Sequence, residues 1–65
     1  MAKITARDDK ELARFKDDDG REYVLTEQGR LLYRWRRGEG FSLSRRNCSL
    51  EQAERIAERA GMVRA

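Results

Sequence analysis

Residues 30–46 read RLLYRWRRGEGFSLSRR, and the predicted fold rests on this stretch more than on any other. Its first half, residues 30–37, alternates apolar side chains with arginines, which is the period of a β-strand with one buried face. Its second half, residues 41–46, alternates in the same way from Phe41 onward. The loop Gly38-Glu39-Gly40 between them has the length and the glycines of a hairpin connection. The stretch therefore predicts two antiparallel strands.

The segment before this hairpin contains two further turn signals. Residues 17–20 read DDDG, and Asp-Gly between two runs of strand-forming residues is a strong sign of a hairpin. Residues 26–29, TEQG, end on a second turn glycine, so a strand is expected at residues 21–25. Residues 8–16 are either a helical turn capped by an aspartate or a strand over residues 12–16. The turn that follows at once favours the strand.

The C-terminal third carries the pattern of an amphipathic helix. Ser49 and Gln52 have the spacing of a capping box, and Gly61 is a typical residue after a helix end. We expect this helix to cover the sheet, and Met62 with Val63 to fold back onto a sheet edge. The apolar face of the helix consists of Leu50, Ala53, Ile56, Ala57 and Ala60.

The expected fold class is α+β, with a three- or four-stranded antiparallel sheet packed against one C-terminal helix. A chain of 65 residues predicts a single small domain, with residues 1–11 as a loose N-terminal arm or an edge strand. The core is expected between the sheet and the helix. Its predicted members are Phe15, Tyr23, Leu25, Leu31, Tyr33, Trp35, Phe41, Leu43, Leu50, Ala53, Ile56 and Ala57.

The residue types argue against catalysis. The chain has no histidine, so the usual general base near neutral pH is missing and no catalytic residue is expected. Cys48 precedes a helix N-terminus, which is expected to lower its pKa, but without a base we interpret it as a small packed residue. The acidic run at residues 17–19 lacks the alternating ligands of a calcium loop. We therefore expect no metal and no cofactor.

Positive charge is concentrated in the same stretch, residues 30–46. The whole chain has 15 basic and 12 acidic residues. Residues 30–46 hold six arginines and one glutamate, whereas residues 1–29 carry more acids than bases and residues 47–65 are balanced. Arginine suits phosphate groups and guanine edges, because its planar fork donates two hydrogen bonds at once.

An arginine-rich sheet face follows from the alternation. Even-numbered positions of both strands are expected on the side away from the apolar row, which the helix leaves open. We expect this face to bind DNA. The competing interpretation is a solvated polar face, which antiparallel sheets often have. The candidate nucleic-acid-binding residues are Arg30, Arg34, Arg36, Arg37, Arg45, Arg46, Ser42 and Ser44.

Three segments resemble the arm-type DNA-binding domain of phage integrases, which is similar to the plant AP2 domain. They are residues 29–36 (GRLLYRWR), 40–44 (GFSLS) and 49–54 (SLEQAE), within a resemblance that covers residues 21–61. The resemblance implies a three-stranded sheet on a C-terminal helix, with the open sheet face in the major groove. By it, the groove-facing positions are Arg30, Arg34, Arg36 and Arg46.

Two features depart from that family. The acidic turn at residues 17–19 suits DNA only if it points away from it. No catalytic or core-binding domain follows, so the module is expected to act alone.

A protein partner is the alternative interpretation. Small phage or mobile-element proteins of the anti-CRISPR kind bind and block a host protein, and the arginine-rich face would then occupy an acidic or nucleic-acid-like surface of that target. A third interpretation is a homodimer that associates through an edge strand or Trp35.

The single cysteine suits a reducing compartment and no long apolar run is present, so a cytoplasmic location without membrane contact is expected.

Overall fold

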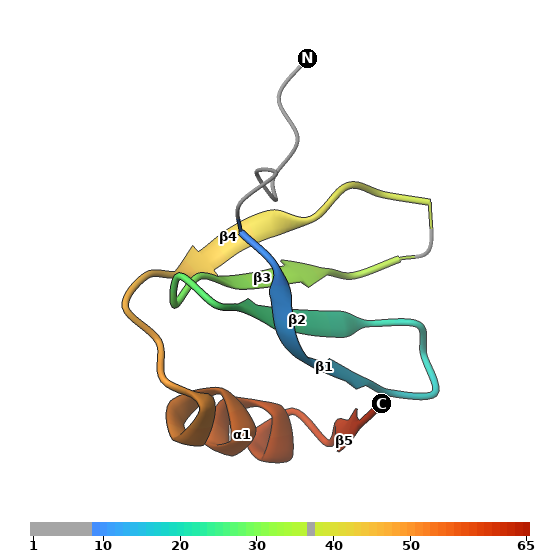
Figure 1. Ribbon diagram of the computed structural model, residues 1–65. Coiled ribbons are helices and arrows are strands. Elements are labelled where there is room, and N and C mark those ends of the chain that lie inside the picture. Colours follow the sequence, from blue (N-terminus) through green and yellow to red (C-terminus); the bar gives the residue numbers. More distant parts are fainter. Residues whose placement is uncertain (1–8, 37) are drawn as a thin grey trace.

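The structure of the chain, a computed structural model, describes residues 9–36 and 38–65 (Figure 1). Its elements in chain order are β1 (Glu11–Lys16), β2 (Glu22–Thr26), β3 (Leu31–Arg34), β4 (Ser42–Arg45), α1 (Leu50–Arg59) and β5 (Val63–Arg64). The strands form one antiparallel sheet in the order β4-β3-β2-β1-β5, so β4 lies at an edge. The predicted α+β fold is confirmed. The sheet has five strands where three or four were expected, because the C-terminal residues that were expected to fold back onto a sheet edge pair with β1 as a strand of their own.

Residues 11–16 form a strand and not a helical turn, as the Asp-Gly turn after them predicts. Asp17 Oδ1 closes that turn by accepting hydrogen bonds from the backbone N–H groups of Asp19 at 3.0 Å and Arg21 at 2.9 Å. Gly20 supplies the φ of 89° that the turn requires. Desolvation alone would raise the pKa of Asp17, but the hydrogen bonds from Arg21 outweigh it and lower the pKa below its usual value of 3.8.

The helix α1 begins and ends where the sequence predicts. Ser49 Oγ accepts a hydrogen bond from the Gln52 N–H at 3.2 Å, and Gln52 Oε1 accepts one from the Ser49 N–H at 3.0 Å, which confirms the capping box. Gly61 follows the last turn with a φ of 74° and redirects the chain toward β5. No helix of the described residues is long and apolar enough to cross a membrane.

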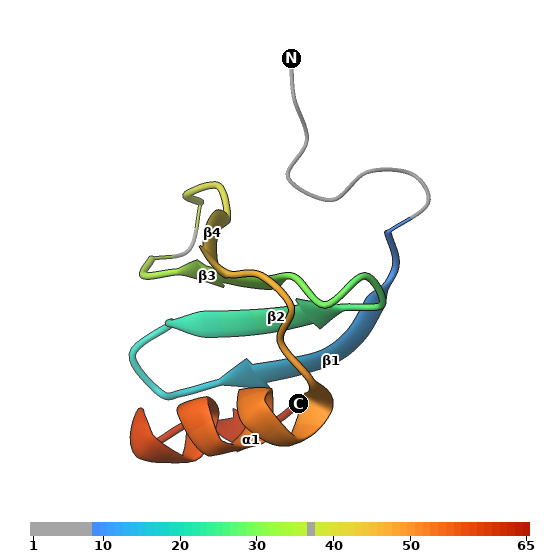
Figure 2. The ribbon, with the colours of Figure 1, turned by 90° about the vertical axis from the view of Figure 1, so that its left-hand side faces the viewer.

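The main core lies between α1 and the strands β1 and β2, which Figure 2 shows side by side. Burying one large side chain such as Leu25 or Leu31 stabilises the fold by about 1.5–3 kcal/mol. Trp35 and Leu50, which the sequence predicted in this core, are 48% and 36% exposed. Trp35 lies beyond the end of β3 and Leu50 is the first residue of α1, so neither is enclosed. The core residues are Ala13, Phe15, Leu25, Leu31, Cys48, Ala53, Ala57 and Met62.

The pairing of β3 with β4 contains a bulge that reverses a predicted orientation. Leu31 pairs with Arg45, but Leu32 pairs with Leu43, so Ser44 is the extra residue. Without the extra residue Leu43 would lie opposite Tyr33, on the helix side. With it, Leu43 moves to the helix-free side of the sheet, because a shift of one residue turns each side chain to the other face. Both strands are also shorter than predicted.

The helix-free face therefore carries an apolar cluster of its own. Val24 and Leu32 are almost fully buried there, although the described helix α1 packs on the opposite face. Phe41, predicted in the main core, lies on this side, with the Arg34 guanidinium 5.0 Å from its ring centre. The helix-free face is thus partly apolar, and not the open arginine surface that the sequence predicted.

Candidate nucleic-acid interface

Two of the predicted arginines are held by buried carboxylates. Arg34 donates to Glu22, whose side chain is 7% exposed and also accepts a hydrogen bond from Arg14 at 3.1 Å. Arg30 Nη1 lies 3.4 Å from the Oδ2 atom of Asp9, whose side chain is fully buried. Both carboxylates come from the acidic N-terminal half of the chain. They neutralise part of the positive face that the sequence placed on these strands.

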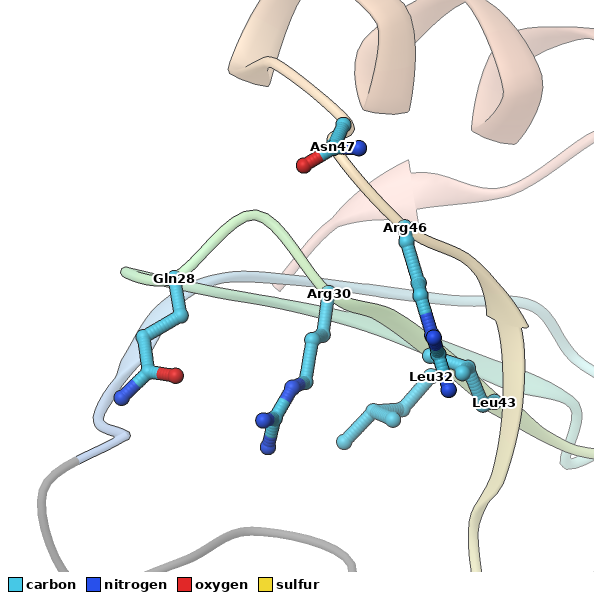
Figure 3. Close-up of a pocket in the computed structure, with 6 residues that line it drawn as sticks. All are labelled: Gln28, Arg30, Leu32, Leu43, Arg46 and Asn47. Carbon is cyan, nitrogen blue, oxygen red and sulfur yellow. The ribbon is translucent and has the colours of Figure 1, made fainter.

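Arg30 and Arg46 line one hollow on the helix-free side. It has a volume of about 410 Å³, and Leu32 and Leu43 form its apolar floor. In Figure 3 the Gln28, Arg30 and Arg46 side chains extend to the same side of the sheet, whereas Asn47 stands apart on the segment that leads to α1. This hollow brings together two of the predicted binding residues at the open end of the β3–β4 hairpin, one just before β3 and the other just after β4.

Arg45 lies on the opposite side of β4, toward the helix. It pairs with the core residue Leu31 and lines a hollow of about 180 Å³ together with Arg55 and Arg59 of α1. Arg55 is also paired with Glu51 at 2.8 Å. Sequence reasoning missed both helix arginines. Their spacing of four residues places them on one helical face, but only the packing of α1 brings that face near Arg45.

The remaining predicted residues contribute less to a common surface. Arg36 and Ser44 are exposed. Ser42 pairs with Tyr33 on the helix side of the sheet, so the prediction that it shares a face with Arg34 is wrong. The bulge at Ser44 shifts the register and turns Ser42 to that side. Arg37 lies outside the described residues.

Cys48 is buried between the end of β4 and α1. Burial raises the pKa of the Cys48 thiol, and the nearby positive charge of Arg45 only partly offsets this effect. The expected lowering by the helix N-terminus is thus wrong in direction. Within residues 9–36 and 38–65, no group of three metal-ligating side chains is close enough to hold an ion.

The chain matches no protein-family model, no curated protein and no solved structure.

Proposed function

We propose that this chain is a non-catalytic nucleic-acid-binding module, with DNA as its partner, and that it binds along the β4 edge of the sheet. The observation that carries the proposal is the gathering of arginines around this one strand. Arg30 and Arg46 line a hollow on one side of it, and Arg45 lines a second hollow with two arginines of α1 on the other. Three separate segments of the chain supply this charge.

The physical basis is the affinity of arginine forks for phosphate oxygens. Each guanidinium donates hydrogen bonds in a plane that matches a phosphate, and contacts to a charged backbone release bound counterions. Arg45 and Arg46 are consecutive at the end of β4, are exposed, and make no ion pair with the described residues. They are therefore the two side chains on which the proposal depends most.

The resemblance to integrase arm-type domains stays a prediction, and the structure changes how it would apply. The central sheet position Arg34 is tied to Glu22, so it is a poor candidate for a groove contact. The proposed contact surface moves from the middle of the sheet to its β4 edge. The acidic turn at residues 17–19 belongs to the β1–β2 hairpin, away from β4 in the strand order.

The test is binding of the whole chain to a mixed-sequence duplex, measured by fluorescence anisotropy. Affinity should fall steeply between about 50 mM and about 200 mM salt, as it does for phosphate-dominated binding. The double variant Arg45→Ala/Arg46→Ala should bind more weakly. It should also reduce the slope of log K against log salt by about 1 for each phosphate that it no longer neutralises.

The matched control is Lys16→Ala/Arg64→Ala, which removes the same charge from the β1–β5 edge. It should lose much less affinity than the β4 variant. The absence of binding even at low salt, or an equal loss in the control, would overturn the proposal.

A protein partner is the second candidate, and the exposed Trp35 favours it. Its ring packs edge-on against Tyr33 with ring centres 5.2 Å apart, and the Arg21 guanidinium lies 5.7 Å from it. Tryptophan, tyrosine and arginine are the commonest anchors of protein interfaces. For a protein partner, Trp35→Ala should weaken binding more than Arg46→Ala.

A further inference from the structure

We propose that the hollow between Arg30 and Arg46 receives one unpaired nucleotide of a single strand, with its base on the leucine floor and its phosphate at the guanidinium groups. The inference rests on the proposed function, and it names the chemical form of nucleic acid that this part of the surface fits. Its support is the combination of an apolar floor, two cationic walls and a neutral amide in one concavity.

The floor is suited to the face of a base. Leu32 is buried, whereas Leu43 is 42% exposed although it is a large apolar side chain. The volume of about 410 Å³ lies within the range of small-molecule sites. In a duplex the base faces are covered by neighbouring base pairs and only the edges are accessible. Contact with this floor therefore requires a base that is out of the stack.

The Arg30 wall and the Gln28 backbone are held in place before any ligand binds. Asp9 accepts a hydrogen bond from the Gln28 backbone N–H at 3.2 Å through Oδ1, and its Oδ2 holds Arg30 Nη1 at 3.4 Å. One buried carboxylate thus positions two residues of the hollow. Arg30 keeps its remaining N–H donors, and the Gln28 carboxamide offers a donor and an acceptor to a base edge.

The neighbouring hollows lack this combination. A hollow of about 190 Å³ also contains Leu32, but its one arginine, Arg14, is already paired with Glu11 of the same hollow. The hollow between Arg45 and α1 is cationic, but its volume of about 180 Å³ is less than half as large. The Arg30–Arg46 hollow is the one of the three in which an anion and an apolar ring fit together.

The test compares single strands that differ only in their bases. Labelled oligothymidylate of about 12 nucleotides should bind about 5-fold more tightly than an abasic strand of the same length, which corresponds to burying about 40 Å² of apolar surface against Leu43. Leu43→Ala should remove most of that difference and leave binding of the abasic strand unchanged. Leu12→Ala, which truncates a leucine of similar exposure on β1, should retain the difference.

Oligouridylate of the same length tests whether the nucleotide comes from RNA instead of DNA. Tighter binding of the base-bearing strand than of the abasic strand, in DNA or in RNA, supports the site. Equal binding of base-bearing and abasic strands, or an equal loss in Leu12→Ala, overturns the base site while the proposed function stands. If no single strand and no duplex binds at low salt, both the site and the proposed function are overturned.

Discussion

Glu22 on β2 lies directly opposite Arg34 on β3, and its carboxylate accepts a hydrogen bond from Arg34 Nε at 3.1 Å. The same carboxylate accepts a hydrogen bond from Arg14 Nη1 of β1, also at 3.1 Å. One nearly buried acid therefore links three strands across the helix-free face. This arrangement gives Arg34 a structural role and separates it from the arginines that remain available at β4.

Removing Glu22 should destabilise the fold. Glu22→Ala leaves two guanidinium groups of limited exposure without their shared partner, and we expect a loss of about 1–3 kcal/mol in the free energy of unfolding. Urea-induced unfolding measures it. The control Glu11→Ala breaks an exposed pair with the same Arg14 and should cost less than about 1 kcal/mol. Equal losses of unfolding free energy in the two variants would show that Glu22 stabilises the fold no more than an exposed ion pair does.

Arg34 and Arg46 should respond differently to neutralisation. Arg34→Gln should lower stability, because it removes one partner of Glu22 and the cation above the Phe41 ring. Arg46→Gln should leave stability nearly unchanged but lower the salt slope of DNA binding by about 1. Paired unfolding and anisotropy measurements separate the two effects. A larger loss of DNA affinity in Arg34→Gln would return the contact surface to the middle of the sheet.

The turn aspartate should make stability depend on pH in the acid range. The pKa of Asp17 in the folded state lies below its ordinary value of 3.8, so the stabilisation is fully present above that value. It is lost as the pH falls through the folded pKa. Asp17→Asn should be less stable than the native chain near pH 7, and the gap should narrow on acidification.

Urea midpoints measured between about pH 2 and pH 6 follow this gap. Asp18→Asn removes the same charge one residue later and should retain the acid-side loss of stability. If the urea midpoints of the native chain and of Asp17→Asn changed with pH in parallel, the ionised Asp17 carboxylate would not stabilise the turn.

The capping box should account for a measurable part of the stability of α1. Ser49→Ala removes the acceptor for the Gln52 N–H and should lower the free energy of unfolding by about 0.5–2 kcal/mol. Ser44→Ala, at the exposed bulge of β4, should change it by less than about 0.5 kcal/mol. The helical circular dichroism signal should melt earlier in the first variant only. Coincident melting curves would mean that packing alone holds the helix end.

Local signals in the sequence were sufficient for most elements. The Asp-Gly turn, the alternation in residues 30–46 and the capping box each depend on residues within a few positions of one another, and all correspond to elements of the structure. The hydrogen bonds of the turn and of the capping box join residues two to four positions apart, so their partners can be identified from the sequence. The concentration of arginine in residues 30–46 can likewise be read directly from the sequence.

The α+β class, the turns, the helix limits and the charge carried by residues 30–46 thus follow from the amino-acid sequence without further information. Which arginines are available follows only from the folded chain, because it depends on contacts between distant segments. Asp9 accepts from one N–H group of Arg30 and leaves its other donors available, whereas Glu22 accepts from both Nε and Nη2 of Arg34. The packing of α1 brings Arg55 near Arg45. The bulge at Ser44 turned Leu43 to the helix-free face, since register is set by packing across strands and a shift of one residue reverses every side chain between the bulge and the hairpin loop.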